Sequence, residues 1–260
     1  MSQKNIKNES SLSENEEARY ARNIIISNIG QEGQKKLKSA KVLIIGTGGL
    51  GSPTALYLAA AGIGTLGLVD FDVVDVSNLQ RQLLHTTPDI DRLKVESAAE
   101  KIGALNPHVN IRKHHMKVTK ENVVKLLEDY DVIAECTDNF DGKFLINDTC
   151  VEMNKPLVFA TVVRFEGQAT TIIPGESPCF RCIFEEPPPP EMAFSGRTSG
   201  ILGAVAGAFG ALQAAEVVKV IINQGNLLTG KLLMWNLFTH EIRKMEIQKN
   251  PHCPACGKKA

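Results

Sequence analysis

The stretch IIGTGGLGSP at residues 44–53 decides the fold of this chain. Gly46, Gly48 and Gly51 have the spacing that permits a tight turn, a close approach of the backbone to a phosphate and close helix packing. The apolar run KVLIIG leads into the turn, and the helical stretch ALYLAAAGI follows it. This order of strand, turn and helix predicts a nucleotide site, which nicotinamide enzymes, flavoenzymes and ATP-dependent ligases have in common.

An acidic residue follows the glycine turn at the distance that such a site requires. The run TLGLVD, residues 65–70, reads as a second buried strand that ends on Asp70. An acid at this position is placed to bind ribose hydroxyls. Glycines that only allow a tight turn would explain Gly46 but not Asp70, so the combination favours a nucleotide site.

The alternation of strands and helices continues through the first 150 residues. We expect a helix at 93–105, a strand at 109–118, a helix at 121–130 and a strand at 132–136. Beyond them, PLVFATVVRF with GQATTIIP, and LLMWNLF with HEIRKMEI, read as two pairs of neighbouring strands. The sequence therefore predicts an α/β fold: a Rossmann-like, doubly wound, mostly parallel sheet extended by antiparallel strands in the C-terminal half.

The composition limits which domain organisations and which classes of partner are possible. Residues 1–18 are polar and are expected to form a flexible tail, and residues 19–260 a single domain with halves at 19–150 and 151–260. The 29 acidic and 29 basic residues balance, so the chain has no excess of positive charge that would indicate a nucleic-acid or membrane partner. The apolar run 201–222 carries Gln213, Glu216 and Lys219, which favours a buried core helix over a membrane span.

Positive charge near the glycine turn bears on the choice between a dinucleotide and ATP. The loop after the second strand contains Asn78 and Arg81, and Lys94 opens the next helix. A dinucleotide needs little beyond backbone amides, whereas attack at the α-phosphorus of ATP gains from preorganised cations. Each cation alone could be an ordinary surface charge, but their grouping favours ATP.

Asp138 and the six histidines are the remaining candidates for catalytic groups. Asp138 follows a predicted strand in ECTDNF, where it could hold Mg²⁺ beside phosphates or cap the helix that begins near Asn139. None of the six histidines points to hydride transfer, and we interpret them as structural or solvent-facing.

The cysteines indicate a metal site. Cys179 and Cys182 form one C-x-x-C pair, and Cys253 and Cys256 form another. Four thiolates suit the tetrahedral coordination of a structural zinc ion, which here would join two distant loops. A redox dithiol is the rival interpretation, but neither pair opens a convincing helix.

The assembled motifs resemble a known family. RYARN, GTGGLG, VDFDVVDVSNLQRQ, the lysine of RLKVESA, ECTDN and the two C-x-x-C pairs together are similar to the MoeB/ThiF/HesA family of ubiquitin-activating-like adenylyltransferases. The resemblance covers residues from about 19 to 257. It implies a cytoplasmic enzyme that uses ATP and Mg²⁺ to adenylate the C-terminal glycine of a small β-grasp sulfur carrier of the MoaD or ThiS kind, ending in Gly-Gly, for molybdopterin or thiamin synthesis.

The resemblance also implies roles for individual residues. Arg22 would reach into the site of a second subunit, so a homodimer would be the working unit, and Asp138 would hold Mg²⁺. The residues at 151–260 would bind the carrier and, through the four paired cysteines, Zn²⁺. The implied nucleotide-binding set is Gly46, Gly48, Gly49, Gly51, Asp70, Asn78, Gln80, Arg81, Lys94, Asp138 and Asn139, and the implied catalytic set is Arg22, Arg81, Lys94 and Asp138.

One departure from the family pattern concerns the step after adenylation. Several relatives carry a transfer cysteine after the first C-x-x-C pair, whereas residues 183–200 here contain none. The hydroxyls of Ser195, Thr198 and Ser199 are poor substitutes, and Cys136 and Cys150 read as buried structural thiols. We therefore expect an enzyme that stops at the acyl-adenylate. Because the chain ends four residues after Cys256, we expect sulfur to come from a separate sulfurtransferase or cysteine desulfurase.

Three other functions stay open from the sequence. The same scaffold could activate another carboxylate, such as a peptide terminus or a group on tRNA. GTGGLG with Asp70 would also suit an NAD-dependent oxidoreductase, although the cations do not. A non-catalytic scaffold for a ubiquitin-like partner would leave Arg22, Arg81 and Lys94 without a purpose.

Overall fold

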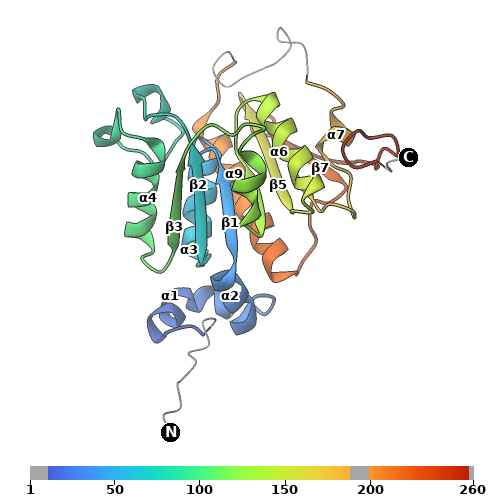
Figure 1. Ribbon diagram of the computed structural model, residues 1–260. Coiled ribbons are helices and arrows are strands. Elements are labelled where there is room, and N and C mark those ends of the chain that lie inside the picture. Colours follow the sequence, from blue (N-terminus) through green and yellow to red (C-terminus); the bar gives the residue numbers. More distant parts are fainter. Residues whose placement is uncertain (1–10, 188–198, 258–260) are drawn as a thin grey trace.

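The computed structural model describes residues 11–187 and 199–257, and within them an eight-stranded sheet in the order β3-β2-β1-β4-β5-β6-β7-β8 (Figure 1). The strands are β1 Lys41–Ile45, β2 Thr65–Asp70, β3 Asn110–His115, β4 Val132–Glu135, β5 Leu157–Val163, β6 Glu166–Ile172, β7 Lys231–Asn236 and β8 Glu241–Glu246. The helices are α1 Glu14–Ile24, α2 Gly30–Ser39, α3 Gly51–Ala61, α4 Lys94–Leu105, α5 Val123–Glu128, α6 Phe140–Glu152, α7 Phe180–Ile183 and α9 Gly203–Ile222, with 3₁₀ turns η1 Val76–Asn78 and η2 Thr87–Asp89.

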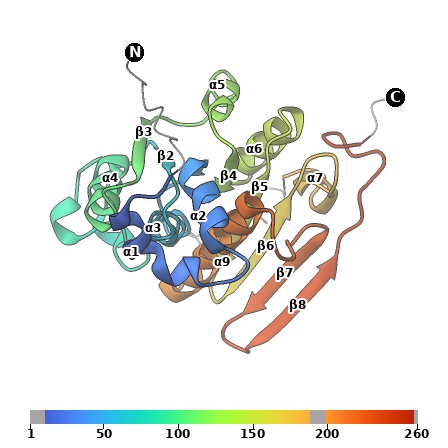
Figure 2. The ribbon, with the colours of Figure 1, turned by 90° about the horizontal axis from the view of Figure 1, so that it is seen from below.

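Helices cover both faces of the parallel part of the sheet, with α3 and α9 on one face and α5 and α6 on the other (Figure 2). Alternate residues of β1 serve the two faces. Val42 and Ile44 pack in the cluster that includes α3, α4 and α9, while Leu43 and Ile45 pack in the cluster that includes α5 and α6. A strand buried on both sides reads as a continuous apolar run, which is the pattern of KVLII.

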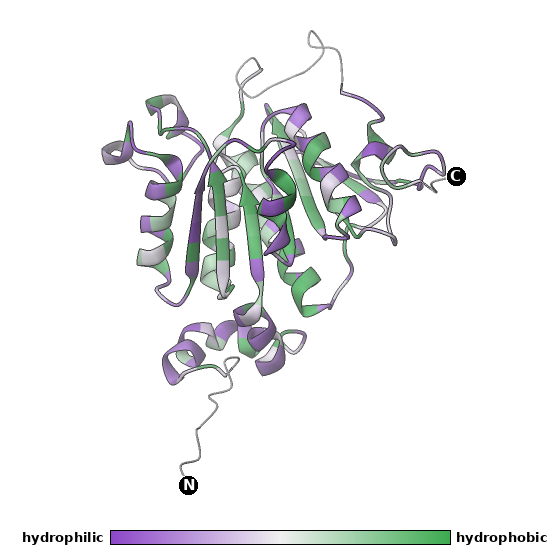
Figure 3. Ribbon diagram, in the orientation of Figure 1, coloured by the Kyte–Doolittle hydropathy of each residue, from purple (hydrophilic) through white to green (hydrophobic). Residues whose placement is uncertain are grey.

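The first five strands of the chain are parallel where they pair, and the pairings β5–β6, β6–β7 and β7–β8 are antiparallel. The predicted fold class is therefore confirmed. No helix separates β5 from β6 or β7 from β8, and connections this short allow only antiparallel pairing. Figure 3 shows the central strands as hydrophobic and the edge strand β3 as hydrophilic, which protects that edge from pairing with another chain.

The topological switch point lies between β1 and β4, which pair side by side although β2 and β3 intervene in the sequence. The glycine turn follows β1, and the segment with Asp138 follows β4. The amide of Cys136 donates to the carbonyl oxygen of Ile45 at 2.9 Å, so the two segments leave the sheet together. Ligands of open α/β sheets bind at such a point, beyond the carboxyl ends of the strands.

Helix α9 is long and apolar enough to cross a membrane, but half of its apolar window is buried against the rest of the chain. A Cβ on Gly210 would lie 2.3 Å from Cγ of Pro53, so the glycine permits close packing on α3. Gln213 donates to the backbone carbonyl oxygens of Glu135 and Val158, and Glu216 accepts from Thr171 and Leu228. The polar residues of the run therefore have partners inside the core, as expected of a buried helix.

The N-terminal segment differs from the predicted tail. Residues 1–10 lie outside the described residues, but α1 begins at Glu14, so the tail prediction is wrong for residues 14–18. Ser13 and Glu16 form a capping box, which satisfies backbone amides at the helix start. Tyr20 is buried and accepts a hydrogen bond from Asn106 at 2.8 Å, which fixes α1 against the domain.

Candidate functional site

A cavity of about 710 Å³ opens at the switch point. Residues from four segments line it: the glycine turn, the end of β2 with the loop after it, residues 116–121, and residues 136–142. Thr161, Val162, Ile201 and Ala206 extend the lining to β5 and the start of α9. The volume lies in the range of ordinary ligand pockets and suits a nucleotide with part of a second substrate.

The glycines of the turn are required by close backbone approaches. Gly46 has φ +94°, and a Cβ on it would lie 2.8 Å from the carbonyl oxygen of Cys136. A Cβ on Gly51 would lie 1.8 Å from the carbonyl oxygen of Gly46. Helix α3 starts at Gly51 without a side-chain cap. Gly48, Gly49 and Leu50, directly before the helix, line the cavity, so the positive end of the helix dipole lies beside it, where phosphate can bind.

Asp70 lines the cavity and also holds the glycine turn in place. One carboxylate oxygen, Oδ2, accepts from the backbone amide of Thr47 at 2.8 Å and from its hydroxyl at 3.0 Å. The other, Oδ1, accepts from the amide of Asp72 at 3.0 Å. Each carboxylate oxygen can accept two hydrogen bonds, so Oδ1 keeps capacity for a ribose hydroxyl.

The His85 ring contacts the backbone of the same turn. The ring is buried, with Nε2 3.3 Å from the carbonyl oxygen of Thr47 and Nδ1 2.9 Å from the hydroxyl of Ser97. Burial lowers the pKa of His85, so the ring is neutral at pH 7. Because a carbonyl only accepts, we assign the proton to Nε2. The structural interpretation of this histidine fits these contacts.

The structure brings Arg81 and Lys94 together at the cavity. Arg81 is half-buried, donates from Nη1 to the carbonyl oxygen of Ser77 at 3.0 Å, and packs against Gly49. Lys94 is 6% exposed, and its Nζ lies 3.1 Å from Oδ2 of Asp72. Two cations therefore face the end of the cavity that the glycine turn forms.

Asn78 and Gln80 do not line this cavity. The Asn78 side chain accepts from the amide of Asp75 and caps η1, and Gln80 donates to the carbonyl oxygen of Ile201 at 3.4 Å. Their predicted nucleotide contacts stay predictions. Gln82, which the sequence analysis did not single out, lines the cavity, is 5% exposed and has Oε1 without a hydrogen-bond partner in the described chain. A buried unpaired oxygen is unusual and marks a position where a ligand can bind.

Asp138 also lines the cavity and follows the end of β4. The alternative that it caps α6 is wrong, because the N-cap is Asn139, whose Oδ1 accepts from the amide of Gly142 at 2.8 Å. An asparagine one residue later satisfies the helix start, which leaves the Asp138 carboxylate available to a ligand. Asn139 also lines the cavity, so its predicted nucleotide contact stays a prediction.

A buried acid, Asp89, fixes the loop that leads into Lys94. Its carboxylate accepts from Thr86, from Arg92 at 2.6 Å and from Lys101 at 3.1 Å. Burial alone would raise its pKa, but the hydrogen bonds from Thr86 and Lys101 hold the pKa of Asp89 well below its usual range. The charged form is therefore the one that stabilises the fold.

Replacing Asp89 by Asn should lower the free energy of unfolding at pH 7 by about 1.5–3 kcal/mol, because charge-assisted hydrogen bonds are lost. A lowered native pKa stabilises the fold above the unfolded-state pKa of about 4 and ceases to do so as the pH falls. The difference between wild type and Asp89→Asn in urea unfolding should thus be about 1 kcal/mol smaller at pH 3 than at pH 7. Glu96→Gln, which removes a more exposed acid on the neighbouring helix α4, serves as control. An unchanged difference would contradict the account.

Arg22 does not line the cavity. It lies exposed near the end of α1, which with α2 lies beneath the sheet at the ends where the strands begin (Figure 1). The glycine turn and Asp138 lie at the opposite ends. A strand of five residues spans roughly 16 Å at about 3.3 Å per residue, so Arg22 cannot reach the cavity of its own chain.

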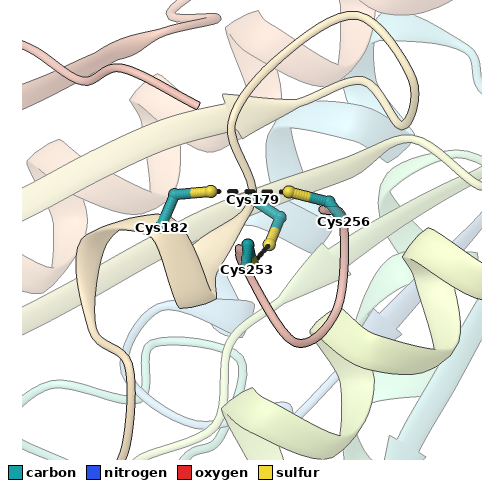
Figure 4. A group of neighbouring side chains, drawn as sticks. All are labelled: Cys179, Cys182, Cys253 and Cys256. Carbon is teal, nitrogen blue, oxygen red and sulfur yellow. Dashed lines mark hydrogen bonds between the residues drawn. The ribbon is translucent and has the colours of Figure 1, made fainter. Parts of the chain in front are cut away.

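The four paired cysteines meet in one cluster (Figure 4). Their sulfur atoms all lie within 4.8 Å of one another, with Cys179 to Cys253 at 3.6 Å and Cys182 to Cys256 at 3.4 Å. A tetrahedron with metal–sulfur bonds of about 2.3 Å has sulfur–sulfur edges of roughly 3.8 Å. The cluster can therefore hold a metal ion that joins α7 to residues 253–256, as the spacing predicted.

The remaining thiols lie apart from this cluster. Cys136 is 7% exposed, and burial raises its pKa to about 12. Cys150 is fully buried, and burial raises its pKa as well. Neither forms a thiolate at neutral pH, as expected of structural thiols. Ser195 and Thr198 lie outside the described residues, and Ser199 is the first residue described after the gap.

Known proteins that are similar to this chain include several adenylyltransferases. Residues 20–255 match the ThiF family. The adenylyltransferase and sulfurtransferase MOCS3 of Culex quinquefasciatus is 43% identical over 247 residues, which are 95% of this chain and 56% of that protein. The sulfur carrier protein adenylyltransferase of Thermus thermophilus is 41% identical over 92% of this chain and 90% of its own length.

The solved structure of Escherichia coli MccB with ATP has a TM-score of 0.82 at 25% identity, and the match covers 96% of this chain and 76% of MccB. The chain spans little more than half the length of several curated relatives it matches. A TM-score of 0.82 over 96% of this chain indicates that MccB shares its fold.

Proposed function

The chain belongs to the ThiF family, and on this premise we propose that it is an adenylyltransferase that uses ATP to activate the C-terminal glycine of a small sulfur carrier protein. The observation that carries the proposal is the meeting of Arg81, Lys94 and Asp138 around a cavity whose floor is the glycine turn. The Thermus thermophilus relative, which matches over nearly its whole length, is named for this activity. The MccB structure, which shares the fold, was solved with ATP.

The proposed reaction joins the glycine carboxylate to the α-phosphorus of ATP and breaks the bond to the oxygen that leads to the β-phosphorus, so that pyrophosphate leaves. The carboxylate is already ionised at neutral pH, so the enzyme needs no general base. Its task is to bring two anions together. The amides at the start of α3 bind phosphate, and Arg81 and Lys94 stabilise the charge that builds up between the reacting groups.

The acid residues of the cavity complete the site. Asp70 would bind the ribose through Oδ1 while it holds Thr47, and Asp138 would hold a magnesium ion. Carboxylate oxygen is the donor that this ion prefers, and Asp138 faces the cavity without a described partner. Bound there, the ion would neutralise phosphate charge and polarise the leaving pyrophosphate.

We propose that a homodimer is the working unit. Arg22 faces away from the cavity of its own chain, so it can serve catalysis only in the site of a second subunit. Exposed apolar side chains lie close to it in the sequence, with Ile25 70% and Ile26 48% exposed. Both features fit a face that a second copy covers.

The four-cysteine cluster, we propose, holds a structural zinc ion. The four sulfur donors leave no open coordination position for catalysis. The site fixes residues 253–256 against α7, and none of the four cysteines lines the cavity. Zinc would therefore stabilise the C-terminal half without acting on the nucleotide.

The carrier is expected to be a MoaD- or ThiS-like protein that ends in Gly-Gly, and the pathway to be molybdopterin or thiamin synthesis in the cytoplasm. With Cys136 and Cys150 buried, we propose that the product is the acyl-adenylate and that a separate sulfurtransferase or cysteine desulfurase supplies sulfur. An NAD-dependent oxidoreductase is not favoured, because Arg81 and Lys94 place more positive charge at the turn than a pyrophosphate bridge needs.

Pyrophosphate exchange tests the proposed function. Purified protein with Mg²⁺, ATP and radiolabelled pyrophosphate should form labelled ATP only when a carrier ending in Gly-Gly is added. A MoaD-like and a ThiS-like carrier, tested in turn, distinguish the two pathways, and carriers that lack the last glycine serve as controls. Exchange with neither carrier, in a protein that binds ATP, would favour activation of another carboxylate.

A further inference from the structure

A buried ion pair lies behind the wall of the cavity that carries Asp138. Nζ of Lys143 is 2.5 Å from Oε2 of Glu135, and the two side chains are 4% and 0% exposed. The Lys143 ammonium group also donates to the carbonyl oxygen of Ala160 at 3.3 Å and lies 4.8 Å from the ring centroid of Phe159. The pair thus joins β4, α6 and β5, the elements that frame this side of the site.

The same glutamate holds the residue next to Asp138. Oε1 of Glu135 accepts from the backbone amide of Thr137 at 2.7 Å, and the hydroxyl of Thr137 donates to the same oxygen. Thr137 lines the cavity, whereas Glu135 and Lys143 do not. The pair can therefore act on a bound ligand only through the backbone and side chains between Cys136 and Asn139.

Stability alone does not account for this arrangement. Removing two charges from water costs several kcal/mol, and buried ion pairs are often no more stabilising than apolar residues of similar size. Lys143 is moreover the fourth residue of α6, close to the positive end of the helix dipole, where a cation is unfavourable. The negative charge of Glu135 offsets that cost. The Glu135 carboxylate is itself held in a fixed position, because both of its oxygens accept hydrogen bonds.

We propose that Glu135 and Lys143 are positioning residues that hold the segment 136–139 so that the Asp138 carboxylate meets the magnesium ion of the bound nucleotide. The inference rests on the proposed function, in which Asp138 is the magnesium ligand. Glu135 orients the segment through Thr137, and Lys143 fixes Glu135 and neutralises its charge. Glu135 then adds no net negative charge next to the Asp138 carboxylate.

ATP binding without a carrier tests this role, because it is measured without turnover. The dissociation constant for ATP is determined by calorimetry in excess Mg²⁺ and again in EDTA, and the ratio gives the gain in affinity due to the metal. Lys143→Met should reduce this gain about tenfold, as loss of a group that orients a metal ligand typically does. The affinity in EDTA should stay within about twofold of wild type.

Two further variants keep the test decisive if Lys143→Met folds poorly. Thr137→Val removes the hydroxyl contact to Glu135 but keeps the shape and the ion pair, and should reduce the magnesium-dependent gain severalfold without lowering the melting temperature. Lys219→Met removes the partner of another buried glutamate, Glu216, more than two turns of α9 beyond the cavity residue Ala206. It should leave the gain unchanged even if it lowers the melting temperature.

Asp138→Asn tests the proposed magnesium ligand separately from the proposed positioning residues. If this variant keeps the full magnesium-dependent gain, the proposed role of Asp138 fails and the inference with it. If Asp138→Asn loses the gain while Lys143→Met and Thr137→Val keep it, the positioning role alone is overturned. Equal weakening of ATP binding with and without Mg²⁺ in Thr137→Val would likewise show a structural role only.

Discussion

Arg81→Ala should lower the rate of carrier adenylation by about 10²–10³-fold, because a preorganised charge at a transition state contributes roughly 2.7–4 kcal/mol. The residue is only half-buried, and its described hydrogen bond is a single one, to the carbonyl oxygen of Ser77. The fold therefore loses little with it. Initial rates of pyrophosphate release at saturating ATP and carrier measure the effect, and the melting temperature should change by no more than about 2 °C.

A matched control removes an arginine with no access to the site. Arg112 lies on the edge strand β3, pairs with Asp129 at 3.0 Å and does not line the cavity. Arg112→Ala should keep the wild-type rate. If Arg81→Ala also keeps it, or if both variants lose activity together, the cations of the cavity do not carry the reaction as we describe.

Loss of the proposed zinc ion should have the largest effect on stability. Cys253→Ser removes one of four sulfur ligands, and Cys253 itself is 5% exposed and packs with α7 and Phe144 in one core cluster. Structural zinc sites contribute about 10–16 kcal/mol of apparent binding free energy in small domains. Even about 4 kcal/mol, at roughly 2–4 °C per kcal/mol, would lower the melting temperature by about 10 °C.

Metal content and activity distinguish this loss from a general defect. Elemental analysis should find one zinc per chain in the wild type and much less in Cys253→Ser. Cys150→Ser, which replaces a buried thiol outside the cluster, should keep the zinc whatever its melting temperature. Below its melting temperature, Cys253→Ser should adenylate the carrier at a rate within about threefold of wild type. A wild-type protein that is stable and free of zinc would refute the assignment.

The parts of the fold that the sequence predicted are those in which one physical pattern dominates. β1 and β2 are buried on both faces, so KVLII and TLGLVD read as strands without ambiguity. The glycine turn was recognisable because the close approaches at Gly46 and Gly51 exclude any side chain. The cysteine spacing likewise predicted a cluster that the structure confirms.

Other features depend on tertiary contacts that no local pattern contains. Helix α1 lies in a polar segment and is held by the contact of Tyr20 with Asn106, 86 residues away. Residues 116–121 line the cavity only because β3 pairs beside β2. The second role of Asp70, as acceptor for Thr47, follows from the distance between two strand ends. The N-cap role of Asn139 could have been predicted from the sequence, since asparagine is as good an N-cap as aspartate.

The most direct test of the account is the mass of the carrier after reaction. The protein is incubated with Mg²⁺, ATP and a carrier ending in Gly-Gly, and the carrier is analysed intact by mass spectrometry. We predict the addition of one adenylyl group, which requires ATP and the terminal glycine and is strongly reduced with Arg81→Ala. A carrier that stays unmodified, with both MoaD-like and ThiS-like proteins and an enzyme that demonstrably binds ATP, would contradict the central claim.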